Sequence, residues 1–139
     1  MPSARAGGCP TGSAVATGAG NLAAQFVFHA VGPVYRDGRH GEAELLASCY
    51  RTCLELAEER GVGTIAFPAI STGVYGYPLE EAARIAAREV QRHLERADCG
   101  IECVLFVVFG RAAYERVAKV LRATISPAPS NGPADRAIP

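Results

Sequence analysis

The sequence predicts an α/β fold, in which helices pack in layers against a sheet. Short apolar segments with the residue types of strands alternate with longer segments that have helical periodicity. The chain has 139 residues, 49% of them hydrophobic, so it can build one core and has little left for a second. We therefore expect a single domain over residues 1–125 and a disordered, proline-rich tail over 126–139.

The first expected elements are two strands and a helix. Residues 15–17 form a short apolar segment, and 26–31 form a stronger strand that closes at Gly32-Pro33, which cannot extend a ladder. Apolar residues then recur with helical spacing over 42–60, and Gly61 is a typical stop signal.

Strand and helix then alternate twice more. Residues 64–67 are an apolar strand, and Pro78 stands where the first residue of the next helix is expected, with Glu80 and Glu81 in its first turn. The nearly continuous apolar run at 102–109 predicts a strand covered on both faces. A last helix is expected over 112–121.

Composition argues against nucleic-acid and membrane partners. The formal net charge is zero and no window is rich in Lys or Arg, so nothing predicts an electrostatic grip on phosphate backbones. No apolar run is long enough to span a membrane, and the first residues form no hydrophobic signal region. We expect a soluble, cytoplasmic protein. The strong preference for Arg over Lys is typical of a GC-rich bacterial genome.

The five cysteines are expected to be reduced thiols. Cys49 and Cys53, like Cys99 and Cys103, are four residues apart, which is the beginning of a zinc-site pattern. Structural zinc sites usually use closer pairs, and Cys49 and Cys53 fall on the apolar stripe of the predicted helix, where a thiol packs as a small apolar side chain. We expect no metal ion and no cofactor.

The most informative segment is the junction between the strand at 64–67 and the helix after Pro78. It contains the loop Ser71-Thr72-Gly73-Val74-Tyr75-Gly76, in which Gly73 and Gly76 permit positive φ and close backbone approach. Successive N–H groups can therefore converge on an anion at the carboxyl end of a strand. The loop has no Lys or Arg, unlike a nucleoside-triphosphate P-loop, so it suits a diphosphate that is held and not transferred.

Four sequence segments carry a family resemblance: GCPTG at 8–12, FHAVGPV at 28–34, FPAISTGVYGYP at 67–78 and FVVF at 106–109. With them the chain resembles the macro domain family over residues 4–121. It is most similar to the branch of ADP-ribosyl-hydrolases that are also described as O-acetyl-ADP-ribose deacetylases. This resemblance implies a three-layer α/β/α sandwich with a mixed sheet.

The resemblance also implies an ADP-ribose site at the carboxyl ends of the central strands. The ligand-binding residues that it implies are Ser71, Thr72, Gly73, Val74, Tyr75, Gly76 and Phe109. In this interpretation the loop wraps the diphosphate and distal ribose, and the Phe109 ring lies at the adenosine end, where stacking on a base contributes about 1 to 3 kcal/mol. Phe109 could instead fill the core, and the Ser71 and Thr72 hydroxyls could shape the turn instead of contacting ligand.

The resemblance is incomplete before the GCPTG motif. Family members have a first strand and a catalytic Asn/Asp loop there, and only about seven residues stand in that place here, so we expect an N-terminally truncated domain. No carboxylate lies beside the loop in sequence, so the catalytic residues stay unknown. His29 fits a core position, and His40 and His93 are expected at the surface. An uncovered sheet edge or helix face would favour self-association.

Three functions therefore stay open. The chain is an ADP-ribose-binding enzyme that hydrolyses mono-ADP-ribosyl esters or deacetylates O-acetyl-ADP-ribose, a binding module without catalysis, or a truncated remnant without activity. The expected partners are ADP-ribose, an ADP-ribosylated protein or O-acetyl-ADP-ribose.

Overall fold

The computed structural model describes residues 9–18, 26–73 and 75–125. Its elements in chain order are β1 (Ala14–Gly18), β2 (Phe26–Ala30), α2 (Glu42–Glu59), β3 (Thr64–Pro68), α3 (Leu79–Leu94), β4 (Cys103–Val107) and α4 (Arg111–Thr124). The predicted alternation of strands and helices is confirmed, with boundaries that differ by a few residues. The tail predicted over 126–139 and the loop residue Val74 lie outside the described residues.

The described strands form two separate pairs. β1 and β2 are antiparallel, with Ala14 opposite Ala30, whereas β3 and β4 are parallel, with Pro68 opposite Val107 at their carboxyl ends. A parallel pair needs a long crossover connection, and here α3 supplies it. Because β3 and β4 run the same way, the loops that follow them leave from one edge of the sheet.

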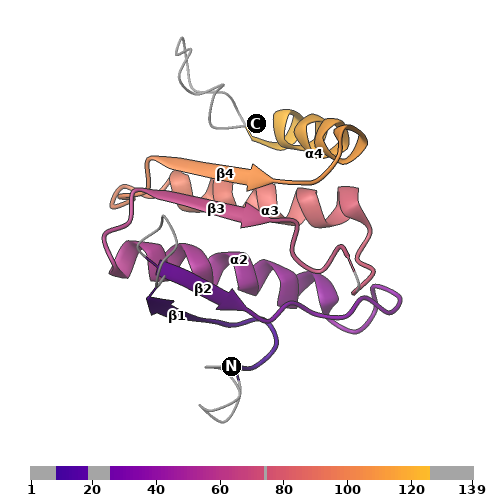
Figure 1. Cartoon of the computed structure of the whole chain (residues 1–139), viewed down its shortest axis with the longest axis horizontal. Helices are drawn as coiled ribbons and strands as arrows, with labels where there is room; N and C mark the ends of the chain where they lie inside the picture. Colours follow the sequence, from indigo (N-terminus) through magenta and orange to yellow (C-terminus); the bar gives the residue numbers. More distant parts are fainter. Residues whose placement is uncertain (1–8, 19–25, 74, 126–139) are drawn as a thin grey trace.

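The helices stack side by side, with α3 between α2 and α4, and in Figure 1 the strands lie in front of α2 and α3. Ile65 and Phe67 of β3 alternate with exposed residues, and Val104 and Phe106 of β4 alternate with less buried ones, so each strand turns one face into the core. Phe67 and Phe106 stack with their ring centroids 5.9 Å apart. The core therefore lies between β3–β4 and the helix layer.

The outer face of β3–β4 is open within the described part of the chain. Val107 is 53% exposed and Ala66 is also exposed. The expectation that residues 102–109 are covered on both faces is wrong, because every second side chain of β4 points away from the helices. This uncovered sheet face comes in addition to the uncovered sheet edge and helix faces that were expected.

Local signals position the helix ends. Gly61, with φ of 67°, follows the end of α2 and takes the left-handed conformation that stops the helix. Pro78 caps α3 from an extended conformation (ψ 131°), so the helix begins one residue later than its sequence suggested. Of the described helices, none has the length and apolar character that crossing a bilayer requires.

Candidate functional site

The candidate site lies at the carboxyl ends of β3 and β4. After their last pair, Pro68 and Val107, β3 continues into residues 69–78 and β4 into Phe109 and Gly110. The sheet topology therefore brings the glycine loop and Phe109, which are more than 30 residues apart in sequence, to one edge. Figure 1 shows this edge beside the start of α3.

Backbone hydrogen bonds close the loop on itself. The Tyr77 N–H donates to the Ser71 carbonyl at 2.9 Å, and the Gly76 N–H donates to the Gly73 carbonyl at 3.0 Å. The Thr72 hydroxyl donates to the Ala69 carbonyl at 2.8 Å. In this structure the Thr72 side chain therefore shapes the turn, one of the two roles that its sequence left open.

Ser71 has the most unusual environment in the loop. Its φ is 69°, a left-handed conformation that costs a non-glycine residue free energy, and its Oγ is buried without a hydrogen-bond partner in the structure. Gly76 also has positive φ (76°), as expected, but Gly73 does not. The reversal falls at Ser71 because the chain turns directly after Ile70 and the Ser71 carbonyl must point back toward Tyr77.

A second loop, residues 31–41, packs against the first. A Cβ atom on Gly32 would collide with Ser71 Oγ and lie 2.7 Å from Ile70 Cγ2, so only glycine fits there. The Tyr35 N–H donates to the Tyr75 carbonyl at 2.9 Å, and the rings of Tyr35 and Tyr77 contact at a centroid distance of 4.8 Å. The two loops therefore form one unit.

Glu42 organises this second loop and is a residue that the sequence analysis missed. Its carboxylate accepts four backbone N–H groups from residues 36–40. The bond from the Arg36 N–H contributes most, and together these bonds lower the pKa of Glu42 to about 2. Glutamates were expected on helix surfaces, but Glu42 is buried. Its place at the first position of a helix, after the polar turn at 36–41, was the available signal.

Tyr50, on α2, hydrogen-bonds to the backbone where the glycine loop begins. Its hydroxyl donates to the Pro68 carbonyl and accepts the Ile70 N–H, both at 3.3 Å. The side chain is buried, and this burial raises the pKa of its hydroxyl. The hydroxyl is therefore a neutral donor and acceptor. It fixes the backbone between Pro68 and Ile70, directly before Ser71.

Aromatic side chains at this edge face solvent. Phe109 is 94% exposed, so the alternative in which it fills the core is wrong. Tyr75, which the resemblance implies as a ligand clamp, is also exposed. Exposed rings beside a donor-rich loop are suited to contact a base or a ribose.

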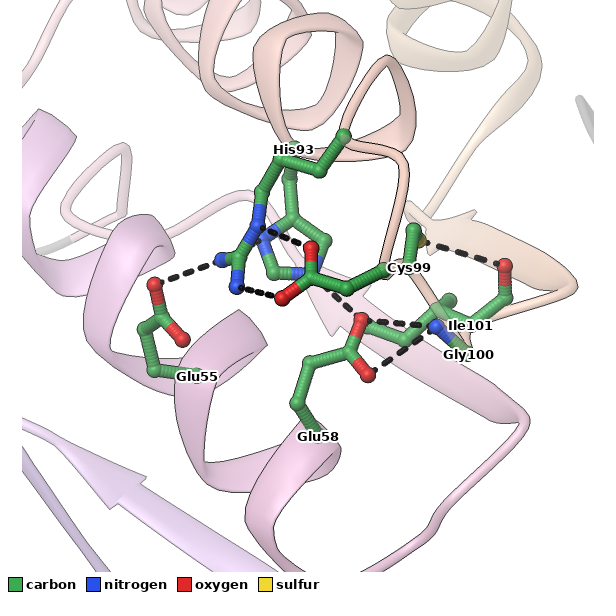
Figure 2. A network of polar contacts seen from close by, with 8 residues as sticks. Glu55, Glu58, His93, Cys99, Gly100 and Ile101 are labelled. Atoms are coloured by element: carbon green, nitrogen blue, oxygen red, sulfur yellow. Dashed lines mark hydrogen bonds and ion pairs between the residues drawn. The ribbon is translucent and has the colours of Figure 1, made fainter.

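A different polar cluster lies at the other end of α3 (Figure 2). His93 is only 5% exposed, and its Nε2 lies 2.8 Å from Glu58 Oε2. Both oxygens of Glu58 accept the Gly100 N–H at 3.0 Å. These bonds connect the ends of α2 and α3 with the loop before β4, and the hydrogen bond with His93 lowers the pKa of Glu58. The expectation that His93 lies at the surface is wrong.

The cluster has metal-ligating residue types, because atoms of Glu58, His93 and Cys99 lie within 4.8 Å of one another. Arg96 Nη1 is 3.3 Å from His93 Nδ1 and, being a donor only, requires Nδ1 to accept. Nε2 then carries the proton and donates it to Glu58. A metal at Nε2 would displace that proton and leave Nδ1–H facing Arg96, so the geometry favours a hydrogen-bonded structural network.

Cys49 and Cys53 also support the interpretation that the thiols pack as small apolar side chains. The Cys49 thiol donates to the Val31 carbonyl at 3.2 Å, and burial raises the pKa of Cys49 to about 11 and of Cys53 to about 12. Both thiols are therefore neutral and pack as small apolar groups. The other described group of metal-ligating types contains Asp37, His40 and Glu42, and there the Glu42 oxygens are already occupied by four N–H groups.

Sequence comparison decides the family. The model of the macro domain matches residues 3–86. The chain belongs to the macro domain family. A macro domain-containing protein of Caldanaerobacter subterraneus is 57% identical over 113 residues, which are 81% of this chain and 63% of that protein. A protein named O-acetyl-ADP-ribose deacetylase 1, from Pantoea vagans, is 46% identical over 117 residues, which are 84% of this chain and 68% of the relative.

Solved macro domains have the same fold. The Oceanobacillus iheyensis macrodomain with ADP is 39% identical and matches with a TM-score of 0.76 over 82% of this chain and 59% of that one. The Trypanosoma brucei macrodomain in complex with ADP-ribose matches with a TM-score of 0.72 at 39% identity, over 81% of this chain and 46% of that one. The α/β macro fold is confirmed. The matched part of the chain covers between 46% and 68% of the length of these relatives.

Proposed function

We propose that this macro domain binds ADP-ribose, with the loop at 71–76 around the diphosphate and Phe109 at the adenosine end. The observation that carries the proposal is Ser71, whose buried Oγ has no partner in the described structure and whose left-handed backbone stands in a loop without charged side chains. The Ser71 and Gly73 N–H groups donate to no other backbone group of the described residues. Free donors and an unpaired hydroxyl are what a bound anion would satisfy.

Named relatives support the same ligand. One relative is called an O-acetyl-ADP-ribose deacetylase, and solved relatives contain ADP or ADP-ribose. They also support an enzymatic form of the proposal, in which water cleaves a mono-ADP-ribosyl ester, or the acetyl ester of O-acetyl-ADP-ribose to give acetate and ADP-ribose.

The second candidate is binding without catalysis. Four N–H donors already occupy the buried carboxylate of Glu42 and lower its pKa to about 2, so Glu42 itself is a poor general base. Turnover of a mono-ADP-ribosylated protein and of O-acetyl-ADP-ribose distinguishes the two candidates, because a folded chain that binds ADP-ribose and releases no product from either substrate is a binding module.

The site is tested by a pair of variants at Gly73. A Cβ at Gly73 would meet no protein atom within 4 Å, so Gly73→Ala should fold, and it should weaken ADP-ribose binding less than Gly73→Glu does. Gly73→Glu places a negative charge beside the diphosphate and should abolish binding of ADP-ribose in calorimetry, with AMP as the control for simple adenine binding. Equal affinity of the Glu and Ala variants would refute the site.

Self-association is a further proposal about partners. The open outer face of β3–β4, which includes Val107 and Ala66, presents apolar side chains that a second copy could cover. Sedimentation over a range of concentrations tests this, and a monomer at every concentration would refute it.

A further inference from the structure

We propose that Glu42 is a positioning residue for the ADP-ribose loop, acting through the turn at 36–40 and through Tyr35. The inference rests on the proposed function, because it concerns how the same loop is held. Glu42 is the first residue of α2 and is only 2% exposed. It lies outside the loop at 71–76, and no sequence motif drew attention to it.

The first step is the set of hydrogen bonds that the Glu42 carboxylate accepts from the turn at 36–40. Oε2 accepts the N–H groups of Arg36 at 2.9 Å and of Asp37 and Gly38 at 3.2 Å. Oε1 accepts the N–H of His40 at 2.8 Å. Four donors from five consecutive residues converge on one carboxylate, which in its ionised form only accepts. The conformation of the turn therefore depends on the charge and shape of a single side chain.

The second step connects the turn with the ligand loop. Tyr35 directly precedes the turn, and its phenol packs against it, since a Cβ on Gly38 would lie 3.1 Å from the Tyr35 hydroxyl oxygen. Tyr35 in turn donates its N–H to the Tyr75 carbonyl at 2.9 Å and places its ring 4.8 Å from that of Tyr77. A shift of the turn thus moves both contacts that hold residues 75–77.

Glu42→Gln separates charge from shape. The amide has nearly the same size, but its NH₂ group is a donor and would face N–H groups that need an acceptor. At least one of the four bonds must break, so the turn rearranges and the closed loop becomes one of several conformations. Apparent affinity falls by the fraction of molecules that keep the competent loop.

The matched control is Glu89→Gln. Glu89 is as deeply buried, at 6% exposure, and accepts hydrogen bonds from Arg51 and Arg92, but it lies on α3 with no hydrogen bond or ion pair to either loop. Calorimetry with ADP-ribose on the full chain should give about tenfold weaker binding for Glu42→Gln. For Glu89→Gln the affinity should stay within about twofold of the wild type, since distant sites are usually independent.

Amide spectra give a readout that does not need the ligand. In ¹H–¹⁵N spectra, Glu42→Gln should move the Tyr35 and Tyr75 signals together with those of 36–40, whereas Glu89→Gln should leave all of them in place. Wild-type affinity in a folded Glu42→Gln chain, or unmoved Tyr35 and Tyr75 signals, overturns the role of Glu42. If the wild-type chain itself fails to bind ADP-ribose, the proposed function is what fails, and the spectra still test the connection from Glu42 to Tyr75.

A second variant covers the case in which Glu42→Gln does not fold. Tyr35→Leu leaves the carboxylate and its four donors unchanged and removes the ring that contacts Tyr77. It should weaken ADP-ribose binding by a similar factor, of about tenfold. Wild-type affinity in this variant overturns the proposal, because the path from Glu42 to the loop runs through Tyr35.

Discussion

The two ends of α3 use polar groups in opposite ways. At its start, a backbone hydrogen bond and packed rings join the loops at 31–41 and 69–77, and the described buried side-chain atom without a partner, Ser71 Oγ, lies there. At its end, side-chain charges pair with one another: Arg96 contacts both Asp98 and Glu55, and His93 contacts Glu58. The first end has unused hydrogen-bonding capacity, and the second has almost none.

This difference indicates where ligand chemistry can occur. A ligand gains free energy from donors that the fold leaves unpaired, whereas a group already paired in the interior must first lose a partner. The charged cluster at the end of α3 has the residue types of an active site, because a histidine, a cysteine and carboxylates lie close together there (Figure 2). Because its groups already hydrogen-bond to one another, this cluster has a structural role: it connects α2, α3 and the loop before β4.

The largest expected effect is at the contact between the two loops. Gly32→Val would drive a side chain into Ser71 and Ile70 and separate the loops. We expect ADP-ribose affinity to fall by about 100-fold or more, the scale of a misplaced binding group. Gly63→Ala is the control, since its Cβ would lie at an ordinary 3.6 Å from the nearest atom. Calorimetry on both variants is the measurement, and near-normal binding by Gly32→Val would break the comparison.

The next effect is a loss of folding stability when a buried hydrogen bond is removed at either end of α3. Only at the start of α3 should ligand binding be weakened as well. Tyr50→Phe removes the hydrogen bonds to the Pro68 carbonyl and the Ile70 N–H, and it should lower the free energy of unfolding by about 1 to 3 kcal/mol. His93→Gln should cost a similar amount at the charged end. Denaturant unfolding measures both. Only Tyr50→Phe should also weaken ADP-ribose binding, and the reverse result would contradict the account.

The smallest effect is a dependence of stability on acid. Hydrogen bonds from Arg116 lower the pKa of Glu80, which joins α3 to α4, from 4.5 to about 2. Because the folded-state pKa is the lower one, this stabilisation is fully present above about pH 4.5 and is lost as the pH falls toward 2.

Thermal unfolding between pH 6 and 2 checks this point. The wild type and both variants are measured in one buffer series at about 0.1 M ionic strength. Glu80→Gln should lose less stability than the wild type as the pH falls through this window. The control is Glu59→Gln, because Glu59 forms no ion pair with a described residue. Identical pH profiles for all three chains would contradict the assigned role of Glu80.

The sequence predicted what depends on local pattern. Periodicity and breaker residues predicted the described strands and helices to within a few residues, because Gly61 and Pro78 act on the backbone next to them. The loop at 71–76 was recognisable for the same reason. The open face of β3–β4 was not, because an apolar run has the same composition whether one face or both are covered.

Contacts between elements were beyond prediction. Tyr50 and His93 stand in helical segments like many other polar residues, and their roles arise only when α2 packs against the end of β3 and against α3. Positive φ was expected at Gly73 and Gly76 and is found at Gly76 and Ser71, since closure of the loop on Tyr77, and not residue type alone, decides where the chain reverses.

The most direct test of the comparison is a titration of ADP-ribose into the ¹⁵N-labelled 139-residue chain, followed in amide spectra. The account predicts saturable shifts that concentrate at residues 31–35, 69–77 and 108–110, with the signals of Glu58, His93 and Gly100 unmoved. Saturable shifts that concentrate around Glu58 and His93, or no shifts from a folded chain, would contradict it.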